Sequence, residues 1–553
     1  MTDDRVEQEY VRRGWWRDET LWTCFARNAA ANPGRLALVD PPNRAAFAAG
    51  EPRSLDYASV LAAAVRLARQ LAACGIGRGD VVLAQLPNVA EAIVALLACA
   101  RLGCLYSPVA TQFREHELRQ LLGRVRPKLV ITFATIDGHD HAGLWRVLCR
   151  DFPAMRLAAW GGNPEMTDVE APPADGTLPV EVPDAATPLT LCWTSGTEGS
   201  MKGVVREHRR WLCFDDAVTD IAGLPPGATL LNPFPVANLA AYVGFILPWL
   251  ATGGTLVMHH PYSLPVFAAQ LGAGNVDFTA TPPALLTLIL QREDIARGLN
   301  LSSLRAIGSG GGPLAPDTMA GFKERYGVDI LNLFGSTEGG SLISGPGDVP
   351  DPRTRATCFP RWGVPGLTWA SRLSQRVRTR LVYVTSGEEV TAPGHPGELR
   401  FRGPGVFAGY HGDPGASAQA FDEQGYYRSG DLFEIAGEGD RYYRFVGRLK
   451  NLVVRGGTNI APEEIENLLA GHPAIAEVAV VGYPDPVMGE KLCAIVVPGQ
   501  GQAPDLAELR RFLVDERKVA GYKVPEKLVV LERLPRNAMG KVLHGELRRA
   551  LGN

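Results

Sequence analysis

The sequence predicts an α/β protein with a large N-terminal domain and a small α+β domain at the C-terminal end. Three observations support this fold class. The chain has 553 residues, and one hydrophobic core stops growing at roughly 250 to 300 residues, so several domains are expected. Strand and helix patterns alternate over residues 1–365, which is typical of parallel sheets covered by helices. Beyond Lys450 the pattern changes to a compact mixture of short strands and helices.

Two α/β subdomains are predicted within the large domain, over residues 1–190 and 191–365. Residues 57–74 place apolar side chains at helical spacing, and the glycine-containing turn at 77–80 then leads into a buried strand. A polar, proline-rich segment over 161–183 is interpreted as a surface linker. The strands predicted in this part of the chain cover 81–86, 129–132, 229–231, 255–258 and 305–307.

Residues 366–446 have a different character, because strand-length runs there mix apolar and polar residues. This pattern predicts a small antiparallel β-barrel that completes an N-terminal domain of residues 1–449. A boundary at 447–451 then separates the C-terminal α+β domain of residues 450–553. Its predicted elements are a helix at 462–470, strands at 477–481 and 492–497, a helix at 506–514 and a strand at 527–531.

The composition is that of a soluble globular protein. With 46% hydrophobic residues, 21% charged residues and a net charge of −3, nothing indicates a nucleic-acid surface. The nine cysteines are scattered and never form a CxxC pair, so reduced thiols are predicted and a metal cluster is not. The polar first ten residues predict no secretory signal, and charges, prolines or glycines interrupt the longest apolar stretches, so no membrane span is predicted either. We therefore expect a cytoplasmic protein.

A glycine-rich loop at residues 194–203, TSGTEGSMKG, directly follows the apolar run 189–193. Glycines let backbone N–H groups turn toward an anion, hydroxyl groups donate further hydrogen bonds, and a lysine adds positive charge. The loop is not a P-loop, because its glycines stand too close together and its lysine is followed by glycine. Taken alone it is equally compatible with an ordinary Gly/Ser turn. The predicted phosphate contacts are Thr194, Ser195, Gly196, Thr197, Glu198, Gly199 and Lys202.

Further motifs follow in order: NLFGSTE at 332–338, YRSGDL at 427–432, GRLKN at 447–451 with RGGTNI at 455–460, and PRNAMGK at 535–541. With these motifs the sequence resembles the acyl-adenylate-forming superfamily of acyl-CoA synthetases, adenylation domains and beetle luciferases, nearly end to end. The segments LPN at 86–88 and FREHEL at 113–118 look most similar to aryl-acid and cyclohexanecarboxylate ligases.

The resemblance implies an enzyme that works in two steps. A carboxylic acid first reacts with ATP to give acyl-AMP and pyrophosphate, and CoA or a pantetheine thiol then takes the acyl group. ATP, Mg²⁺ and CoA are the implied cofactors. The C-terminal domain is implied to be mobile, with its hinge at Lys450, and Gly456 and Gly457 would line the thiol tunnel.

The resemblance also implies roles for single residues. Lys541 would bridge the substrate carboxylate and the α-phosphate, Glu338 would bind Mg²⁺, and Asp431 would accept hydrogen bonds from the ribose hydroxyls. Arg448 would be a second ribose or phosphate contact. The implied catalytic set is Lys541, Glu338, Thr194 and Lys202, with Thr194 as a further oxygen for the metal. The remaining implied nucleotide contacts are Gly311, Gly312, Asn332, Leu333, Phe334, Gly335, Ser336 and Thr337.

The implied acyl pocket is built mainly from small and uncharged residues, which would leave room for a bulky ring. No lysine, arginine or aspartate is predicted in its walls. We therefore expect an aromatic, alicyclic or other bulky hydrophobic acid. The predicted wall residues are Asn238, Leu239, Tyr242, Gly310, Gly311, Gly339, Gly340 and Ser341.

Several positions depart from the family pattern. Glu198 and Met201 alter the phosphate loop, which puts its ATP affinity in doubt. Asn451 stands where relatives often have aspartate, His544 where arginine is common, and Phe334 where tyrosine is common, which leaves core packing as an alternative role for Phe334.

Alternatives to a CoA ligase stay open at this point. The enzyme could load the pantetheine of an acyl carrier protein, or stop at the acyl-AMP. A catalytically silent nucleotide sensor is the alternative from another class. The identity of the acid is open, as is the choice between a monomer and a homodimer.

Overall fold

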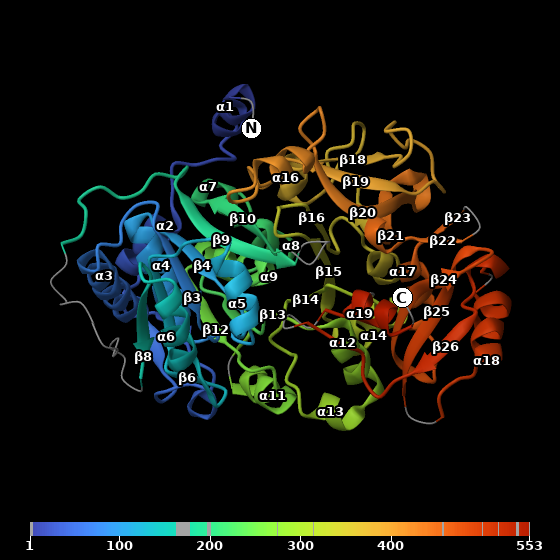
Figure 1. The fold of residues 1–553 in the computed structure, drawn as a ribbon, viewed down its shortest axis with the longest axis horizontal. Helices are drawn as coiled ribbons and strands as arrows, with labels where there is room; N and C mark the ends of the chain where they lie inside the picture. The colour runs from blue at the N-terminus through green and yellow to red at the C-terminus, as the bar shows by residue number, and fades with distance from the viewer. Residues whose placement is uncertain are drawn as a thin grey trace.

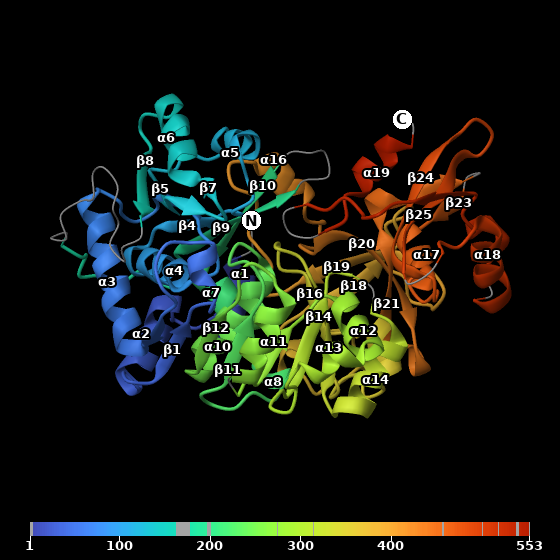
Figure 2. The same cartoon turned by 90° about the horizontal axis from the view of Figure 1, so that it is seen from below.

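The computed structural model describes residues 4–161, 177–195, 201–273, 275–312, 314–455, 458–499, 502–517, 519–537 and 541–551. Figure 1 shows the chain passing from two α/β units through a β-rich unit to the C-terminal domain, and Figure 2 shows the same units from below. The predicted linker at 161–183 lies mostly outside the described residues.

A six-stranded sheet forms the core of the first unit. Its strands are parallel except for the edge strand β10, which runs antiparallel to β9. All five residues of β3 are buried, as expected for a strand covered on both faces. In spatial order the strands are β10 (Met201–Glu207), β9 (Pro188–Ser195), β4 (Leu105–Pro108), β3 (Val81–Gln85), β5 (Leu129–Phe133) and β8 (Arg156–Trp160).

An eight-stranded sheet forms the second unit. Its inner strands are parallel, and the two edge strands β16 and β2 are antiparallel to their neighbours. In spatial order the strands are β16 (Ser341–Ser344), β15 (Asp329–Gly335), β14 (Ala306–Gly310), β13 (Phe278–Ala280), β11 (Thr229–Asn232), β12 (Thr255–Met258), β1 (Leu36–Val39) and β2 (Ser54–Asp56). A two-stranded hairpin, β6 (Thr135–Ile136) with β7 (His139–Asp140), lies apart from both sheets.

The predicted division of the large domain at residue 190 is wrong at the level of the sheets. β1 and β2 join the second sheet, where Leu38 pairs with Leu256, while β9 and β10 join the first sheet. Long crossover connections let parallel strands join a sheet far from their place in the chain, so chain order does not determine sheet membership.

Helices α2, α3, α4 and α10 pack against one another and share one apolar core with both α/β sheets. The predicted helix at 57–74 is confirmed as α3. The helices of the large domain are α1 (Asp4–Arg12), α2 (Leu21–Ala31), α3 (Tyr57–Ala73), α4 (Ala90–Leu102), α5 (Glu115–Leu122), α6 (His141–Asp151), α7 (His208–Leu212), α8 (Ala217–Ile221), α9 (Leu239–Ala241), α10 (Leu247–Thr252), α11 (Leu264–Ala273), α12 (Pro283–Gln291), α13 (Glu293–Arg297), α14 (Pro316–Tyr326), α15 (Pro352–Thr357) and α16 (Pro414–Gln419), with a π-helical turn η2 (Tyr242–Ile246). Among the described helices none is both long enough and apolar enough to cross a membrane.

The third unit is an antiparallel sheet, in the region where the sequence predicts a barrel. Its strands are β17 (Cys358–Pro360), β21 (Tyr442–Arg448), β20 (Tyr427–Ala436), β19 (Gly397–Arg402) and β18 (Arg378–Val382), in that spatial order. The end strands β17 and β18 each pair with one neighbour, so the unit is a sheet with two edges and not a closed barrel.

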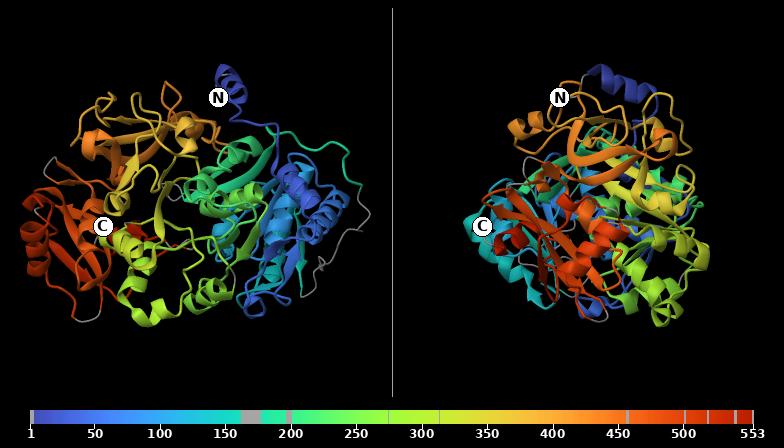
Figure 3. Two further views of the ribbon diagram at one scale, coloured as in Figure 1. Left: turned by 180° about the vertical axis from the view of Figure 1, so that it is seen from behind. Right: turned by 90° about the vertical axis from the view of Figure 1, so that its right-hand side faces the viewer.

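The C-terminal domain is the predicted α+β unit. It combines β23 (Thr458–Ile460), β22 (Val453–Arg455), β25 (Gly489–Pro498), β24 (Ile475–Asp485) and β26 (Lys527–Val530) with α17 (Pro462–Leu469), α18 (Leu506–Arg511) and α19 (His544–Ala550). Helix α17 packs on β24 of its own domain and on β21 of the antiparallel sheet. Figure 3 shows this domain beside the antiparallel sheet. The C-terminal domain is therefore docked on the large domain.

Trp249 connects three helices of the shared core and provides a test of it. Its ring is fully buried, lies 5.7 Å from that of Phe25 and 5.9 Å from that of Tyr57, and donates a hydrogen bond to Gly254 O. We expect Trp249→Ala to lower the free energy of unfolding by about 3 to 5 kcal/mol, because it leaves a large cavity. Urea unfolding followed by circular dichroism measures this. The control Val147→Ala, at an exposed position of α6, should change it little, and equal losses in both variants would contradict the prediction.

Candidate active site

Strands β9 and β10 present the glycine-rich loop. Thr194 and Lys202 are directly opposite each other in the antiparallel pair, and both side chains are half-buried. Lys202 Nζ lies 4.9 Å from the centre of the Tyr410 ring. The predicted phosphate contacts Gly196, Thr197, Glu198 and Gly199 lie outside the described residues, and only the backbone of Ser195 is described, so their roles remain predictions.

Glu338 lies on a turn after β15 and is 9% exposed. Three contacts hold it in place. Arg206 Nη1 donates to Thr337 O at 3.0 Å, Phe407 N donates to Glu338 O at 2.8 Å, and Tyr410 Oη donates to Glu338 Oε1 at 3.1 Å. Burial and the nearby Glu338 charge raise the pKa of Tyr410, so its hydroxyl stays a donor. The carboxylate is therefore fixed both through its backbone and through one of its oxygens.

Glycines at and near this turn allow neighbouring segments to pack closely. A Cβ atom at Gly339, whose φ is +101°, would lie 2.1 Å from Gly405 O, and one at Gly340 would lie 2.8 Å from the Phe401 ring. A Cβ atom at Gly310 would lie 2.1 Å from Leu333 O. The sequence predicts that these glycines leave room for the acyl group. At all three positions protein atoms occupy the space that a Cβ atom would need, so close packing also requires glycine there, and their place in the wall of the acyl pocket stays a prediction.

Asp431 lies in β20, directly opposite Arg448 in β21, and its side chain is 2% exposed. Arg448 Nε is 2.9 Å from Asp431 Oδ1, but no described residue makes a hydrogen bond to that oxygen. Burial raises the pKa of Asp431 to about 6, against the opposing charges of Arg448 and Lys541. A buried acceptor without a donor fits a ligand hydroxyl.

Lys541 comes from the C-terminal domain and lies within electrostatic reach of this site. Its backbone is fixed by a reciprocal pair: Asn537 N donates to Lys541 O, and Lys541 N donates to Asn537 Oδ1, both at 2.9 Å. The side chain keeps contact with solvent. Desolvation lowers its pKa, as does the charge of Arg448, while Asp431 and Glu338 act in the opposite direction. The structure thus brings together Lys541, Asp431 and Glu338 from separate parts of the chain.

The other residues of the NLFGSTE motif have defined packing. Asn332 donates to the carbonyls of Arg355 and Ala356 and so anchors α15. The half-buried Phe334 ring packs edge-on against Phe433 at 5.0 Å, within a cluster of aromatic residues. This contact supports the core-packing alternative for one side of Phe334, and stacking on adenine remains a prediction. Leu333, Gly335, Ser336 and Thr337 follow on β15 and its turn, whereas Gly311 and Gly312 lie exposed after β14.

The segment predicted to line the acyl pocket is held by a residue that sequence reasoning missed. Asn88, buried at the start of α4, donates to Phe234 O at 2.7 Å and accepts from Val236 N at 3.0 Å. Asn238 caps α9 by accepting from Ala240 N, and Leu239 follows it. The loop is therefore anchored to the first α/β unit.

Two residues of the following π-helical turn bear on the predicted acyl pocket. Tyr242 is fully buried and stacks on Trp211 at 4.5 Å, and its hydroxyl has no hydrogen-bond partner among the described residues. Gly244 is buried, yet a Cβ atom built on it would meet no atom within 4 Å apart from its own helix backbone. A buried glycine beside open space indicates a hollow. The sequence signal was a glycine within an apolar helix, which indicates a packing or functional reason.

The hinge region packs closely on both sides of Lys450. Asn451 Nδ2 donates to Glu463 Oε1, and a Cβ atom at Gly447 would lie 2.6 Å from Glu463 Oε2. His544 Nε2 lies 2.8 Å from Glu466 Oε1. Lys450 is exposed in the turn between the domains. Gly456 and Gly457 lie outside the described residues, so the thiol tunnel remains a prediction.

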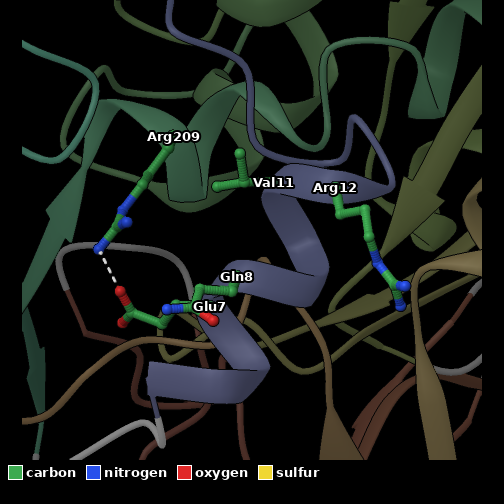
Figure 4. Close-up of a pocket in the computed structure, with 5 residues that line it drawn as sticks. All are labelled: Glu7, Gln8, Val11, Arg12 and Arg209. Atoms are coloured by element: carbon green, nitrogen blue, oxygen red, sulfur yellow. Dashed lines mark hydrogen bonds and ion pairs between the residues drawn. The ribbon is translucent and has the colours of Figure 1, made fainter.

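A separate surface hollow lies beside helix α1, where Arg209 forms an ion pair with Glu7 at 3.1 Å (Figure 4). None of the residues that line it belongs to the predicted site. We therefore assign no ligand to it.

Comparison with known proteins identifies the family. Residues 25–411 match the AMP-binding enzyme family, and residues 464–541 match the AMP-binding enzyme C-terminal domain. Pyochelin synthase of Pseudomonas aeruginosa is 30% identical over 547 residues, covering 98% of this chain and 94% of its own. Indoleacetate–CoA ligase of Aromatoleum aromaticum is 31% identical over 527 residues, covering 94% and 96%. ATP-bound MatB of Rhodopseudomonas palustris has a TM-score of 0.80 at 25% identity, covering 97% and 99%.

The chain belongs to the AMP-binding enzyme family. It is an AMP-forming ligase that uses ATP to activate a carboxylic acid. The predicted superfamily and the predicted fold of a large N-terminal and a small C-terminal domain are confirmed. The roles of single residues are not tested by these likenesses.

The described residues of the ligase fit ATP and Mg²⁺. Asp431 Oδ1 is buried and accepts no hydrogen bond from the described residues. It can therefore accept one from a ribose hydroxyl. Magnesium keeps several waters and takes one or two carboxylates together with substrate phosphates, so Glu338 alone suffices as a protein carboxylate. The described part of the chain contains no group of three or more His, Cys, Asp or Glu side chains that could hold a metal ion.

The ionisation of Asp431 predicts how ATP binding by the ligase depends on pH. A carboxylate accepts two ribose hydroxyls, and protonation removes that capacity. Because the pKa of Asp431 is raised to about 6, the ionised fraction falls as the pH drops below 6. We expect the KM for ATP to rise by up to about tenfold between pH 7 and pH 5.

Steady-state kinetics of Asp431→Asn provide the control for this pH dependence. The amide should bind ATP more weakly at every pH, and the rise in KM toward low pH should disappear. A variant that keeps the wild-type pH profile would contradict the assignment.

Proposed function

We propose that the ligase activates an aromatic, alicyclic or other bulky hydrophobic acid and transfers the acyl group to CoA. The observation that carries this proposal is the convergence of Lys541, Asp431 and Glu338 from two domains and three motifs. Each supplies a group that one part of the adenylation reaction requires: Lys541 a positive charge, Asp431 a hydrogen-bond acceptor and Glu338 a metal-binding carboxylate.

The first step brings two anions together, since a carboxylate oxygen attacks the α-phosphate of ATP. Its rate depends on positioning and on fixed charges that stabilise the developing negative charge. In our proposal Lys541 bridges the two anions, Glu338 holds Mg²⁺ on the phosphates, and Asp431 orients the ribose. Lys202 and Thr194 contact the outgoing phosphates from the glycine-rich loop.

The substrate class rests on the segment around Asn238 and on Gly244. The hollow beside Gly244 supports a bulky acyl group, because its lining glycine offers no side chain to fill it. Neighbouring residues of the turn, Tyr242 and Phe245, are apolar over most of their surface and buried. A relative named indoleacetate–CoA ligase supports an acid with a ring system.

The second step requires a thiol to reach the acyl-AMP. In the described arrangement α17 lies against β21, so we propose that the C-terminal domain turns about Lys450 to admit the thiol. CoA is our proposed acceptor, and the pantetheine of a carrier protein is the alternative. The alternative acceptor is kept because one relative is named a pyochelin synthase and not a CoA ligase.

One set of assays tests the proposal. ATP/pyrophosphate exchange across benzoates, alicyclic acids, fatty acids and amino acids should respond most strongly to ring-bearing acids. AMP release with the best acid should then depend on CoA. Exchange that no acid supports would exclude a ligase and favour a silent sensor, whereas exchange without any CoA dependence would favour carrier loading or an enzyme that stops at acyl-AMP.

Lys541→Ala tests the role of the lysine in the first step. We expect the rate of pyrophosphate exchange to fall about 100- to 1,000-fold, because one preorganised charge at the reacting atoms is lost. Thioester formation from supplied acyl-AMP should be less affected. Lys527→Ala, at an exposed lysine of the same domain, is the control, and an unchanged exchange rate in Lys541→Ala would refute the role.

Gly244→Leu tests the acyl hollow. The added side chain should lower kcat/KM for ring-bearing acids roughly 10- to 100-fold through steric conflict, and change that for acetate much less. Gly272→Leu, at an exposed helical glycine with equally open surroundings, should not discriminate between acids. Equal losses for all acids in Gly244→Leu would argue against an acyl hollow at this position.

A further inference from the structure

Tyr410 joins two parts of the site that the sequence motifs treat separately. It lies between β19 and α16 and is not one of the predicted site residues. Its hydroxyl donates to Glu338 Oε1 at 3.1 Å, and its ring faces Lys202 Nζ at 4.9 Å. One side chain thus contacts both the residue proposed to hold Mg²⁺ and the lysine of the phosphate loop.

The backbone around Tyr410 is fixed to both partners. Tyr410 N donates to Ser417 Oγ, and His411 N donates to Gly203 O of β10, each at 2.8 Å. Phe407 N donates to the backbone carbonyl of Glu338, also at 2.8 Å, and its ring packs edge-on against that of Tyr410 at 4.8 Å. The Tyr410 ring therefore has little freedom to leave this position.

The two contacts have different chemistry. A hydroxyl that donates to one carboxylate oxygen fixes the plane of the carboxylate and leaves the second oxygen for a cation. An aromatic face attracts an ammonium group without neutralising it. With the tyrosine in place, Lys202 and Glu338 are each held by the same neutral side chain. Without it, the two opposite charges would be free to pair with each other.

We propose that Tyr410 is a positioning residue of the ligase. It orients Glu338 so that Oε2 binds the metal ion, and it keeps Lys202 available for the phosphates. This inference rests on the proposed role of Glu338, since the tyrosine acts only through its two partners.

The test measures metal binding directly and needs no acid substrate. Electron paramagnetic resonance follows the titration of Mn²⁺ into the wild-type ligase and into Tyr410→Phe, each in the presence of ATP. We expect the Mn²⁺ affinity of Tyr410→Phe to be about tenfold lower, as for loss of a group that orients a metal ligand. Its thermal stability without ligands should stay close to wild type, because the ring is retained.

Tyr410→Leu removes both contacts and should weaken Mn²⁺ binding further than Tyr410→Phe does. Its affinity for ATP without metal should also fall, because Lys202 then pairs with Glu338. Tyr443→Phe is the matched control: it removes a hydroxyl from a fully buried tyrosine of β21, one that contacts Thr379. It should bind Mn²⁺ as the wild type does.

A second measurement separates orientation of Glu338 from a general loosening of the fold. In a Glu338→Gln background, adding Tyr410→Phe should produce no further loss of Mn²⁺ affinity, because the acceptor carboxylate is already gone. Wild-type affinity in Tyr410→Phe, or an equal loss in Tyr443→Phe, would overturn the inference. If the wild type itself fails to bind Mn²⁺ with ATP, the proposed function fails at its metal site and not at Tyr410.

Discussion

Opposite charges from the two domains meet around one buried carboxylate, and the rest of the site depends on this meeting. Asp431 is almost inaccessible to solvent and lies beside Arg448, while Lys541 reaches the same region from the C-terminal domain. Burial makes the charge of Asp431 costly unless a partner or a ligand compensates it. In the function proposed above the nucleotide provides this compensation, because it offers ribose hydroxyls to the carboxylate and phosphates to the lysine.

Much of the fold followed from sequence patterns, and its limits have physical causes. Helix α3 and the strands β5 and β12 lie where their apolar spacing predicts them, since local periodicity reports local structure. Sheet membership was predicted wrongly at β1 and β9 because strand pairing is a long-range property. The predicted small β-barrel takes the form of an antiparallel sheet with two open edges, since an alternating pattern indicates antiparallel strands but does not count the hydrogen-bonded neighbours of an edge strand.

The site divides in a similar way. The ordered motifs pointed to Glu338, Asp431 and Lys541, whose roles are those that the family resemblance implies. They did not identify Asn88, Gly244 or Tyr410, because these act through contacts between segments distant in the chain. The glycines at 339 and 340 illustrate the same limit. Sequence reveals that a side chain is absent there, but only the fold reveals that Gly405 and Phe401 occupy the space that a Cβ atom would need.

The contact between Asn451 and Glu463 has a consequence for how the ligase would cycle between its two steps. Both residues follow Lys450 in the chain, so this contact of a neutral amide with a carboxylate turns with the small domain and stays intact. On the large-domain side the same carboxylate is approached by Gly447, which carries no charge, and exposed ion pairs are the contacts that salt screens most. The energy of domain rotation at this joint should therefore vary little with ionic strength, even though substrate binding next to it depends on charge.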